Sequence, residues 1–181
     1  MHVLVLGGIR SGKSLLAEQA AARLGQAEGL PVSYVATARA SDAEMAERIR
    51  RHRLRRPANW RTIEAGGDPD ALPQAVEALR GDGSILLLDC LSLWVAAATD
   101  PKAQEELFSQ RLERLLAAVA QVPHAIVVSV EAGLGLVPLE PLSRLFLDSL
   151  GDANQAFART SERVVLAVAG LPWALKGDGL P

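Results

Sequence analysis

The chain has 181 residues, 49% of them hydrophobic and 22% charged, which suits one domain over residues 1–181 with a single sizeable core. Its formal net charge of −2 argues against a general nucleic-acid-binding or membrane-surface protein. The single cysteine, Cys90, excludes an intramolecular disulfide framework, and the sequence lacks the apolar segment that export or membrane insertion requires, so we expect a cytoplasmic protein.

The first predicted strand, Val3–Leu6, runs directly into a loop that matches the phosphate-binding pattern G-x-x-x-x-G-K-[ST]. The loop consists of Gly7, Gly8, Ile9, Arg10, Ser11, Gly12, Lys13 and Ser14. A helix predicted from Ser14 to Leu24 completes the strand–loop–helix context. In such a loop, backbone N–H groups surround the phosphates, the lysine reaches the β- and γ-phosphates, and the hydroxyl binds Mg²⁺. We therefore expect a nucleoside triphosphate, whereas Ile9 breaks the G-x-G-x-x-G pattern of NAD-binding proteins.

Predicted strands and helices alternate along the rest of the chain. Apolar runs at 32–36, 85–88, 125–130 and 164–168 indicate buried strands, and helical patterns lie at 42–55, 70–79, 102–120 and 139–159. The alternation predicts a three-layer α/β domain with a mostly parallel sheet between helices, the P-loop NTPase (RecA-like) class of fold. The ligand is expected at the carboxyl ends of the strands, and the tail from Pro172 to Pro181 is expected to be less ordered.

The predicted helix at 42–55 begins at a capping box, residues 41–44 (Ser-Asp-Ala-Glu), and is rich in arginine. Residues Arg48, His52 and Arg56 recur at every fourth position, so His52 lies on a helical stripe between two arginines. This positive field suits a polyphosphate and, by like-charge repulsion, favours the neutral imidazole, which is the nucleophilic form. On the charge pattern alone, however, a solvated helix face with an incidental histidine is the favoured interpretation.

An acidic residue, Asp89, follows the buried run Ile85–Leu88. In nucleotide-hydrolysing and nucleotide-transferring proteins of the phosphate-loop class, a carboxylate at such a strand end holds Mg²⁺ directly or through water. An aspartate that only begins a turn is the alternative. Because the phosphate loop is present, we favour Asp89 and Ser14 as the metal-binding residues.

Further short motifs accompany the phosphate loop: Tyr34–Ala38, Asp42–Met45, Arg48-Ile49, His52-Arg53, Arg56-Pro57, Trp60–Thr62, Glu64, Leu88–Trp94, Glu131–Pro138, Asn154-Gln155 and Ala169-Gly170. Together they resemble the bifunctional adenosylcobinamide kinase/adenosylcobinamide-phosphate guanylyltransferase family of cobalamin biosynthesis. The resemblance covers nearly the whole chain, and its most specific part joins Asp42 to Glu64.

The resemblance implies a two-step reaction. The family phosphorylates adenosylcobinamide with a nucleoside triphosphate, either ATP or GTP, and then transfers GMP from GTP onto the new phosphate, giving adenosylcobinamide-GDP. In the family, a histidine at the position of His52 attacks the α-phosphate of GTP and carries GMP as a phosphoramidate. The resemblance thus makes His52 and Lys13 the catalytic residues, with Mg²⁺ as the metal, and it implies a homo-oligomer, a trimer in the best-known members.

The resemblance also implies a set of nucleotide-binding residues beyond the loop. Glu64 is expected to accept hydrogen bonds from N1–H and the exocyclic amine of guanine, because an ionised carboxylate is a pure acceptor. Without the resemblance, Glu64 is equally well interpreted as an exposed carboxylate at a strand end. The remaining expected nucleotide contacts are Ala36, Thr37, Ala38, Arg53, Leu54, Arg55, Arg56 and Asp89.

Three positions depart from the family pattern. Val130 stands where the family often has asparagine, and Leu147 and Asp152 stand where arginines are common. Two positive charges are therefore missing, which affects the kinase step or substrate affinity if those arginines contact a phosphate or the corrinoid, and only assembly if they make subunit contacts. The sequence also leaves two other functions open. One is a phosphate-loop kinase that never guanylylates itself, and the other is a non-catalytic GTP-binding regulatory protein.

Overall fold

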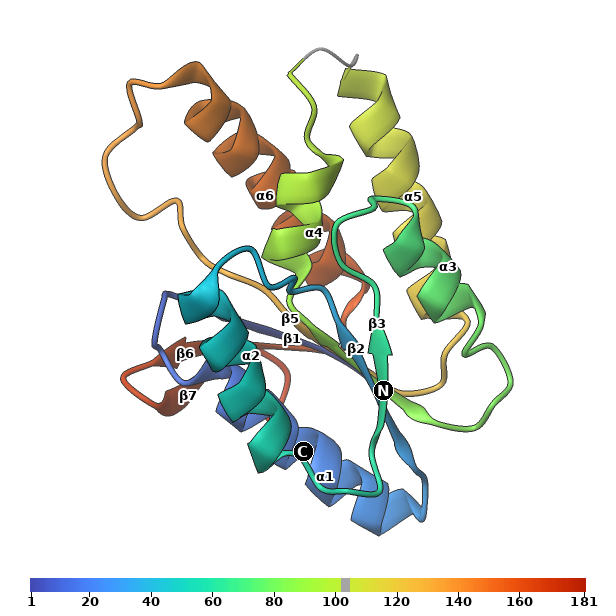
Figure 1. The fold of residues 1–181 in the computed structure, drawn as a ribbon. Coiled ribbons are helices and arrows are strands. Elements are labelled where there is room, and N and C mark those ends of the chain that lie inside the picture. Colours follow the sequence, from blue (N-terminus) through green and yellow to red (C-terminus); the bar gives the residue numbers. More distant parts are fainter. Residues whose placement is uncertain (102–104) are drawn as a thin grey trace.

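The computed structural model describes residues 1–101 and 105–181, and within them a seven-stranded sheet lies between two layers of helices (Figure 1). Residues 102–104, at the start of the helix expected over 102–120, lie outside the described part. In chain order the elements are β1 (His2–Gly7), α1 (Lys13–Glu28), β2 (Val32–Ala36), α2 (Ala43–Arg55), β3 (Arg61–Glu64), α3 (Ala71–Glu77), β4 (Ile85–Asp89), α4 (Leu91–Ala98), α5 (Glu105–Ala120), β5 (Ala125–Val128), α6 (Pro141–Thr160), β6 (Arg163–Val168) and β7 (Leu171–Lys176).

The strands stand in the order β3-β2-β4-β5-β1-β6-β7. All neighbouring pairs are parallel except β6 and β7, which are antiparallel. The expected α/β architecture with a mostly parallel sheet is therefore confirmed. Among the described residues, no helix is both long and apolar enough to cross a membrane.

Alternate residues of the central strands face two separate hydrophobic clusters, as the two-residue period of a strand requires. Leu4 and Leu88 join the cluster covered by α3, α4, α5 and α6, whereas Val5 and Leu87 join the cluster covered by α1. Figure 1 shows α1 and α2 on one side of the sheet and the other four helices on the opposite side. Continuous apolar runs such as Ile85–Leu88 are thus explained by burial on both faces.

The parallel register brings several strand ends to one edge of the sheet. Ala36 at the end of β2 pairs with Glu64 on β3 and with Asp89 on β4. The loop between β1 and α1 begins at the same edge, because β1 lies next to β5. Side chains from four distant parts of the sequence therefore meet where the phosphate loop lies, as expected for a ligand at the carboxyl ends of parallel strands.

The expectation of a less ordered tail from Pro172 to Pro181 is wrong. Residues 171–176 form β7, which pairs with β6 through a two-residue turn at Ala169 and Gly170. Both turn residues have positive φ values, 51° and 81°, which is the signature of a type I′ hairpin turn. Every residue of β7 is exposed, so this strand lacks the burial on which the prediction of the other strands rests.

Other element boundaries also differ from the predictions. The cap of α2 is Asp42 rather than Ser41, because the Asp42 carboxylate accepts the Met45 N–H at 2.8 Å. Glu64 does end a strand, β3, but no strand was predicted over its mostly exposed residues. No helix was predicted over α4, whose residues form a continuous apolar segment. The last long helix, α6, begins at Pro141, two residues after the predicted start.

Candidate functional site

The phosphate loop connects the first strand to the first helix in a tight turn. Gly12 stands at the N-terminus of α1 with φ 92°, and a side chain there would also approach Gly170 Cα to 3.0 Å. A side chain at Gly7 would collide with Ser11 Oγ and with the Ala167 carbonyl. Both positions therefore require glycine, which fits a loop whose backbone closely approaches an anion.

The β6–β7 hairpin supports this loop from behind. The Gly170 N–H donates to the Ser11 carbonyl at 2.9 Å. Ala169 and Gly170 were noted in the sequence only as part of the family resemblance. In the structure their turn holds the middle of the phosphate loop against the end of the sheet.

Lys13, Ser14 and Asp89 form the polar floor of the site. Lys13 Nζ donates to the Gly8 carbonyl at 3.1 Å, so the ammonium folds over its own loop. Ser14 Oγ donates to Asp89 Oδ1 at 3.2 Å, and the Tyr34 hydroxyl donates to Asp89 Oδ2 at 2.6 Å. Burial is the main cause that lowers the pKa of Lys13 and raises the pKa of Tyr34, so the phenol remains protonated and acts as a donor.

The donor set at the floor fits Mg²⁺. A serine hydroxyl and a carboxylate, the oxygen ligands that this hard cation prefers, lie within hydrogen-bond distance of each other beside the phosphate loop. The two residues that the sequence analysis proposed as metal ligands are therefore adjacent. When bound there, the cation would supply positive charge that stabilises phosphate oxygens.

A cavity of about 970 Å³ lies above this floor, and α2 forms one of its walls. The cavity collects Lys13 and Ser14 from the loop region, Asp89 from β4, Glu64 from β3 and His52 from α2. Further predicted residues that line it are Ile9, Ala36, Ala38, Arg53 and Arg56. The cavity thus brings the predicted phosphate, metal and nucleophile positions together in one place.

His52 is half-buried in this cavity, and one of its ring nitrogens has two neighbours. Nδ1 lies 3.2 Å from Arg55 Nη2 and 3.8 Å from Glu18 Oε1. Burial and then the Arg55 guanidinium lower the pKa of His52 below its ordinary value of 6.5, while the Asp89 carboxylate opposes them. The neutral imidazole was expected from like-charge repulsion, and desolvation proves to be the larger cause.

Arg56 offers unpaired donors at the same site. Its guanidinium lies over the Tyr34 ring, 3.4 Å from the centroid, and its Nε and Nη1 atoms are buried without a hydrogen-bond partner among the described residues. Buried N–H groups without partners cost about 1–3 kcal/mol each, so they indicate a missing acceptor. A phosphate group supplies acceptors of the required kind.

The remaining arginines of α2 are largely neutralised. Arg50 and Arg51 both pair with Glu47, and Arg55 donates to Glu18 at 3.3 Å. The concentrated positive field predicted for this segment is thus weaker than a count of its arginines indicates. Of the predicted stripe, Arg48, His52 and Arg56 do line the cavity together.

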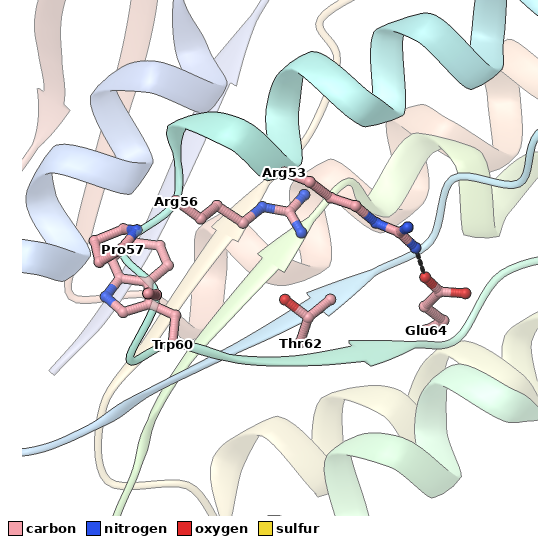
Figure 2. A pocket seen from close by; sticks show the side chains of 7 residues that line it. Arg53, Arg56, Pro57, Trp60, Thr62 and Glu64 are labelled. Carbon is pink, nitrogen blue, oxygen red and sulfur yellow. Dashed lines mark hydrogen bonds and ion pairs between the residues drawn. The ribbon is translucent and has the colours of Figure 1, made fainter.

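A smaller pocket of about 480 Å³ opens between α2 and β3 (Figure 2). Figure 2 shows the Arg53 guanidinium reaching the Glu64 carboxylate, with which it forms an ion pair, while Trp60 and Pro57 close the other end. The exposed Glu64 carboxylate lies at the border of the main cavity, and Trp60 lies at the opposite end of the smaller pocket. The carboxylate is a hydrogen-bond acceptor of the kind that the N–H groups of a base require.

Some predicted nucleotide contacts lie away from the cavity. The Leu54 side chain is 71% exposed, and Arg55 turns to Glu18 instead. Thr37 is buried, donating from Oγ1 to the Cys90 carbonyl at 2.7 Å and accepting the Cys90 N–H at 2.9 Å. Five predicted residues of the phosphate loop do not line the cavity, so any contact with phosphate comes from their backbone: Gly7, Gly8, Arg10, Ser11 and Gly12.

Two site residues were given no role by the sequence analysis. Tyr34 fixes Asp89, and the buried Glu18 contacts both Arg55 and His52. Glu18 stands four residues after Ser14 on α1, so the helical period was the one available signal that it shares the loop's face. Ligand atoms of Glu18, His52 and Asp89 lie within 4.8 Å of one another, but the Arg55 guanidinium against two of them opposes a second cation there.

The three departures from the family pattern lie at different depths. Val130 lines the cavity, and its carbonyl accepts from Asn154 Nδ2 at 3.0 Å. Leu147 is partly buried on α6, whereas Asp152 lies exposed on the same helix. Of the three residues that depart from the family pattern, only Val130 lines the cavity, where it contributes an apolar side chain.

Comparison with known proteins gives concordant matches over nearly the whole chain. A family model described as "Cobinamide kinase / cobinamide phosphate guanyltransferase" matches residues 3–175. The bifunctional adenosylcobalamin biosynthesis protein CobP of Pseudomonas aeruginosa is 48% identical over 181 residues, covering 99% of this chain and 100% of that protein. The proteins named CobU from Escherichia coli and Salmonella typhimurium are 35% and 36% identical over 189 residues, each covering 97% of this chain and all of the relative.

Proposed function

Since the chain belongs to the cobinamide kinase/cobinamide phosphate guanyltransferase family, we propose that residues 1–181 form one domain that catalyses both the kinase and the guanylyltransferase reaction. It phosphorylates adenosylcobinamide with ATP or GTP. It then transfers GMP from GTP, through a guanylylated histidine, to adenosylcobinamide phosphate and so forms adenosylcobinamide-GDP.

One observation carries this proposal: His52 lines the same cavity as Lys13, Ser14 and Asp89. A phosphate loop alone would serve a simple kinase. A half-buried imidazole with a lowered pKa beside that loop adds a neutral nucleophile at the place where the phosphates bind. The full-length similarity to proteins named bifunctional likewise does not favour a kinase without guanylyltransferase activity or a non-catalytic GTP-binding protein.

In the kinase reaction, the substrate hydroxyl attacks the γ-phosphorus and the nucleoside diphosphate leaves. The loop N–H groups and the Lys13 ammonium hold the β- and γ-phosphate oxygens and stabilise the charge that develops on them. Ser14 and Asp89 would hold Mg²⁺, which neutralises charge on the same oxygens when it is bound.

In the transferase reaction, a neutral nitrogen of His52 attacks the α-phosphorus of GTP. A P–N bond forms, the bond from the α-phosphorus to the bridging oxygen breaks, and pyrophosphate leaves with that electron pair. The unpaired donors of Arg56 are suited to stabilise the phosphoryl oxygens. An oxygen of adenosylcobinamide phosphate then displaces the imidazole, which is a competent leaving group.

The proposal is tested by incubating the purified protein with adenosylcobinamide, Mg²⁺ and either ATP alone or ATP with GTP. The expected product with ATP alone is adenosylcobinamide phosphate, and with GTP present it is adenosylcobinamide-GDP. Chromatography of the corrinoids separates the outcomes. Phosphorylation that never proceeds to the GDP product would reduce the function to that of a kinase, and tight GTP binding without either product would indicate a regulatory protein.

Glu64 is proposed to select guanine. Substitution Glu64→Gln removes the charged acceptor and is expected to lower kcat/KM for GTP in the guanylylation by about 10- to 100-fold, the worth of a hydrogen bond to a charged group. Phosphorylation driven by ATP should stay near the parent rate, because adenine lacks the N1–H and the amine at that position. The matched variant Glu113→Gln removes an exposed carboxylate on α5 and should change neither rate. An equal loss with GTP and ATP would contradict a role in base selection.

The lowered pKa of His52 gives the guanylylation a defined pH dependence. The reactive form is the deprotonated one, so the rate falls only as the pH drops through the pKa. Because that pKa lies below 6.5, kcat/KM for GTP should still be above half its maximum at pH 6.5. Initial labelling rates between about pH 5.5 and pH 8 test this, with near-UV circular dichroism as the control for folding. A midpoint above 6.5 would contradict it.

We further propose that the protein is a cytoplasmic homotrimer. The proposal of subunit contacts is supported by exposed apolar side chains in the loop before α6, where Leu136 is 97% and Leu139 is 95% exposed, and on β7, where Trp173 is 64% exposed. Such groups are typical of surfaces that another chain covers. Light scattering after size-exclusion chromatography should give three times the chain mass of 19.2 kDa, and a monomer would contradict the proposal.

A further inference from the structure

The buried carboxylate of Glu18 has no part in the reaction described so far, although it lies at the nucleophile. Glu18 is 7% exposed on α1, one helical turn beyond Ser14. Its Oε1 atom is 3.3 Å from Arg55 Nη2 and 3.8 Å from His52 Nδ1. Carboxylates are almost never buried without a partner, so these two contacts account for its position.

The two neighbours of His52 Nδ1 have opposite effects on the proton of the ring. A guanidinium only donates, so contact with Arg55 makes Nδ1 an acceptor and leaves the proton of the neutral ring on Nε2. Glu18 Oε1 lies 3.8 Å from Nδ1, beyond hydrogen-bond distance, but a carboxylate only accepts, so a hydrogen bond between the two would place the proton on Nδ1 and leave Nε2 with a free electron pair. The two contacts therefore select different tautomers of one imidazole.

Only one of these tautomers can react at the free side of the ring. Nδ1 is enclosed by Glu18 and Arg55, whereas Nε2 makes no hydrogen bond to any residue that the structure describes. A nucleophile needs an unprotonated nitrogen facing the phosphorus, so attack from Nε2 requires the proton to be on Nδ1. A carboxylate behind a catalytic imidazole sets the tautomer in this way in other enzymes.

We propose that Glu18 is a positioning residue that accepts the Nδ1–H of His52 and thereby keeps Nε2 free to attack the α-phosphorus of GTP. As the Nε2–P bond forms and pyrophosphate leaves with the electrons of the broken P–O bond, the ring gains positive charge and keeps its Nδ1 proton. Glu18 stabilises that charge. When the imidazole leaves again, it departs neutral with the same proton on Nδ1.

Arg55 competes with Glu18 for the Nδ1 atom of His52. Its Nη2 atom lies 3.2 Å from Nδ1, nearer than Glu18 Oε1 at 3.8 Å. Glu18 can accept the Nδ1–H only when the Arg55 guanidinium has moved off Nδ1.

The inference rests on the proposed function and is tested by comparing Glu18→Gln with the parent in two reactions. Guanylylation in a single turnover with α-³²P-labelled GTP should fall by about 100-fold or more, since an amide donor can hold the wrong tautomer. ATP-driven phosphorylation of adenosylcobinamide, which does not use His52, should stay near the parent rate. Glu28→Gln, an exposed carboxylate on the same helix, is the matched control and should leave both rates unchanged.

The tautomer is observed directly with ¹⁵N-labelled histidine. In the complex with a GTP analogue whose α- and β-phosphorus atoms are joined by a methylene group, NMR should show the Nδ1–H form of His52 in the parent and a loss of that form in Glu18→Gln. A merely structural role of Glu18 would leave the tautomer unchanged and would lower both reactions together. If Glu18→Gln does not fold, Glu18→Asp keeps the charge at a greater distance and should reduce guanylylation alone.

The outcomes separate this inference from the proposed function. A parent that is labelled on His52 together with an unimpaired Glu18→Gln variant overturns only the role of Glu18. Equal losses in guanylylation and phosphorylation also overturn that role, because they indicate a structural effect. A parent that never becomes labelled overturns the proposed transferase reaction and the inference with it.

Discussion

Replacement of His52 by alanine is expected to separate the two reactions of this protein. Guanylylation should fall by about 10⁴-fold or more, because the nucleophile itself is removed. Phosphorylation of adenosylcobinamide should continue near the parent rate, because the loop, Lys13 and the Ser14–Asp89 pair remain in place. With ATP and GTP both present, adenosylcobinamide phosphate should accumulate, as measured by chromatography of the corrinoids.

His124→Ala is the matched control for that result. His124 is partly buried just before β5, outside the cavity, so its loss tests for a general effect of removing an imidazole. The control variant should form adenosylcobinamide-GDP at the parent rate. Continued formation of that product by His52→Ala would contradict a role of His52 as the carrier of GMP.

Replacement of Lys13 by alanine should instead impair both reactions. Lys13 is the charged group that folds over the phosphate loop, and both reactions bind a triphosphate there. Losing one preorganised donor to developing charge costs about 10²- to 10³-fold in kcat, and we expect losses of that size in phosphorylation and in guanylylation. Initial rates of the two reactions, measured at saturating nucleotide, test the expectation.

The control for Lys13→Ala is Lys176→Ala. This change removes the same charge from β7, where the ammonium donates to carbonyls at the end of α6. Both activities should persist in the control. A Lys13→Ala variant that lost only one of the two activities would show that the reactions do not share one triphosphate site.

The sequence predicted the parts of the site that depend on neighbouring residues. The phosphate loop could be recognised because its glycines, Lys13 and Ser14 are consecutive and follow a buried strand. Asp89 was recognised for the same reason, as the polar end of an apolar run. The parallel sheet also followed from local patterns, because strands buried on both faces are continuously apolar.

Other features depend on contacts between distant residues and were missed. The strand β7 is exposed along its whole length, so only its pairing with β6 reveals it. Glu18 resembles any polar residue of an alanine-rich helix until α2 places Arg55 and His52 against it. Likewise, the ion pairs of Arg50 and Arg51 with Glu47 neutralise part of the predicted positive field.

The resemblance to a known family supplied what the residues alone left open. On charge pattern, His52 was better explained as an incidental residue of a solvated helix, and the structure instead places it half-buried in the cavity of the phosphate loop. Leu54 shows the opposite case, since the resemblance implied a nucleotide contact and its side chain is exposed away from the cavity.

The central claim is that His52 carries GMP as a covalent intermediate. The most direct measurement is incubation of the parent and the His52→Ala variant with Mg²⁺ and α-³²P-labelled GTP, followed by assay of protein-bound label for stability in acid and in alkali. The account predicts acid-labile, alkali-stable label on the parent and none on the variant, as a phosphoramidate requires. Equal label on both proteins, or no label on a parent that demonstrably binds GTP, would contradict it.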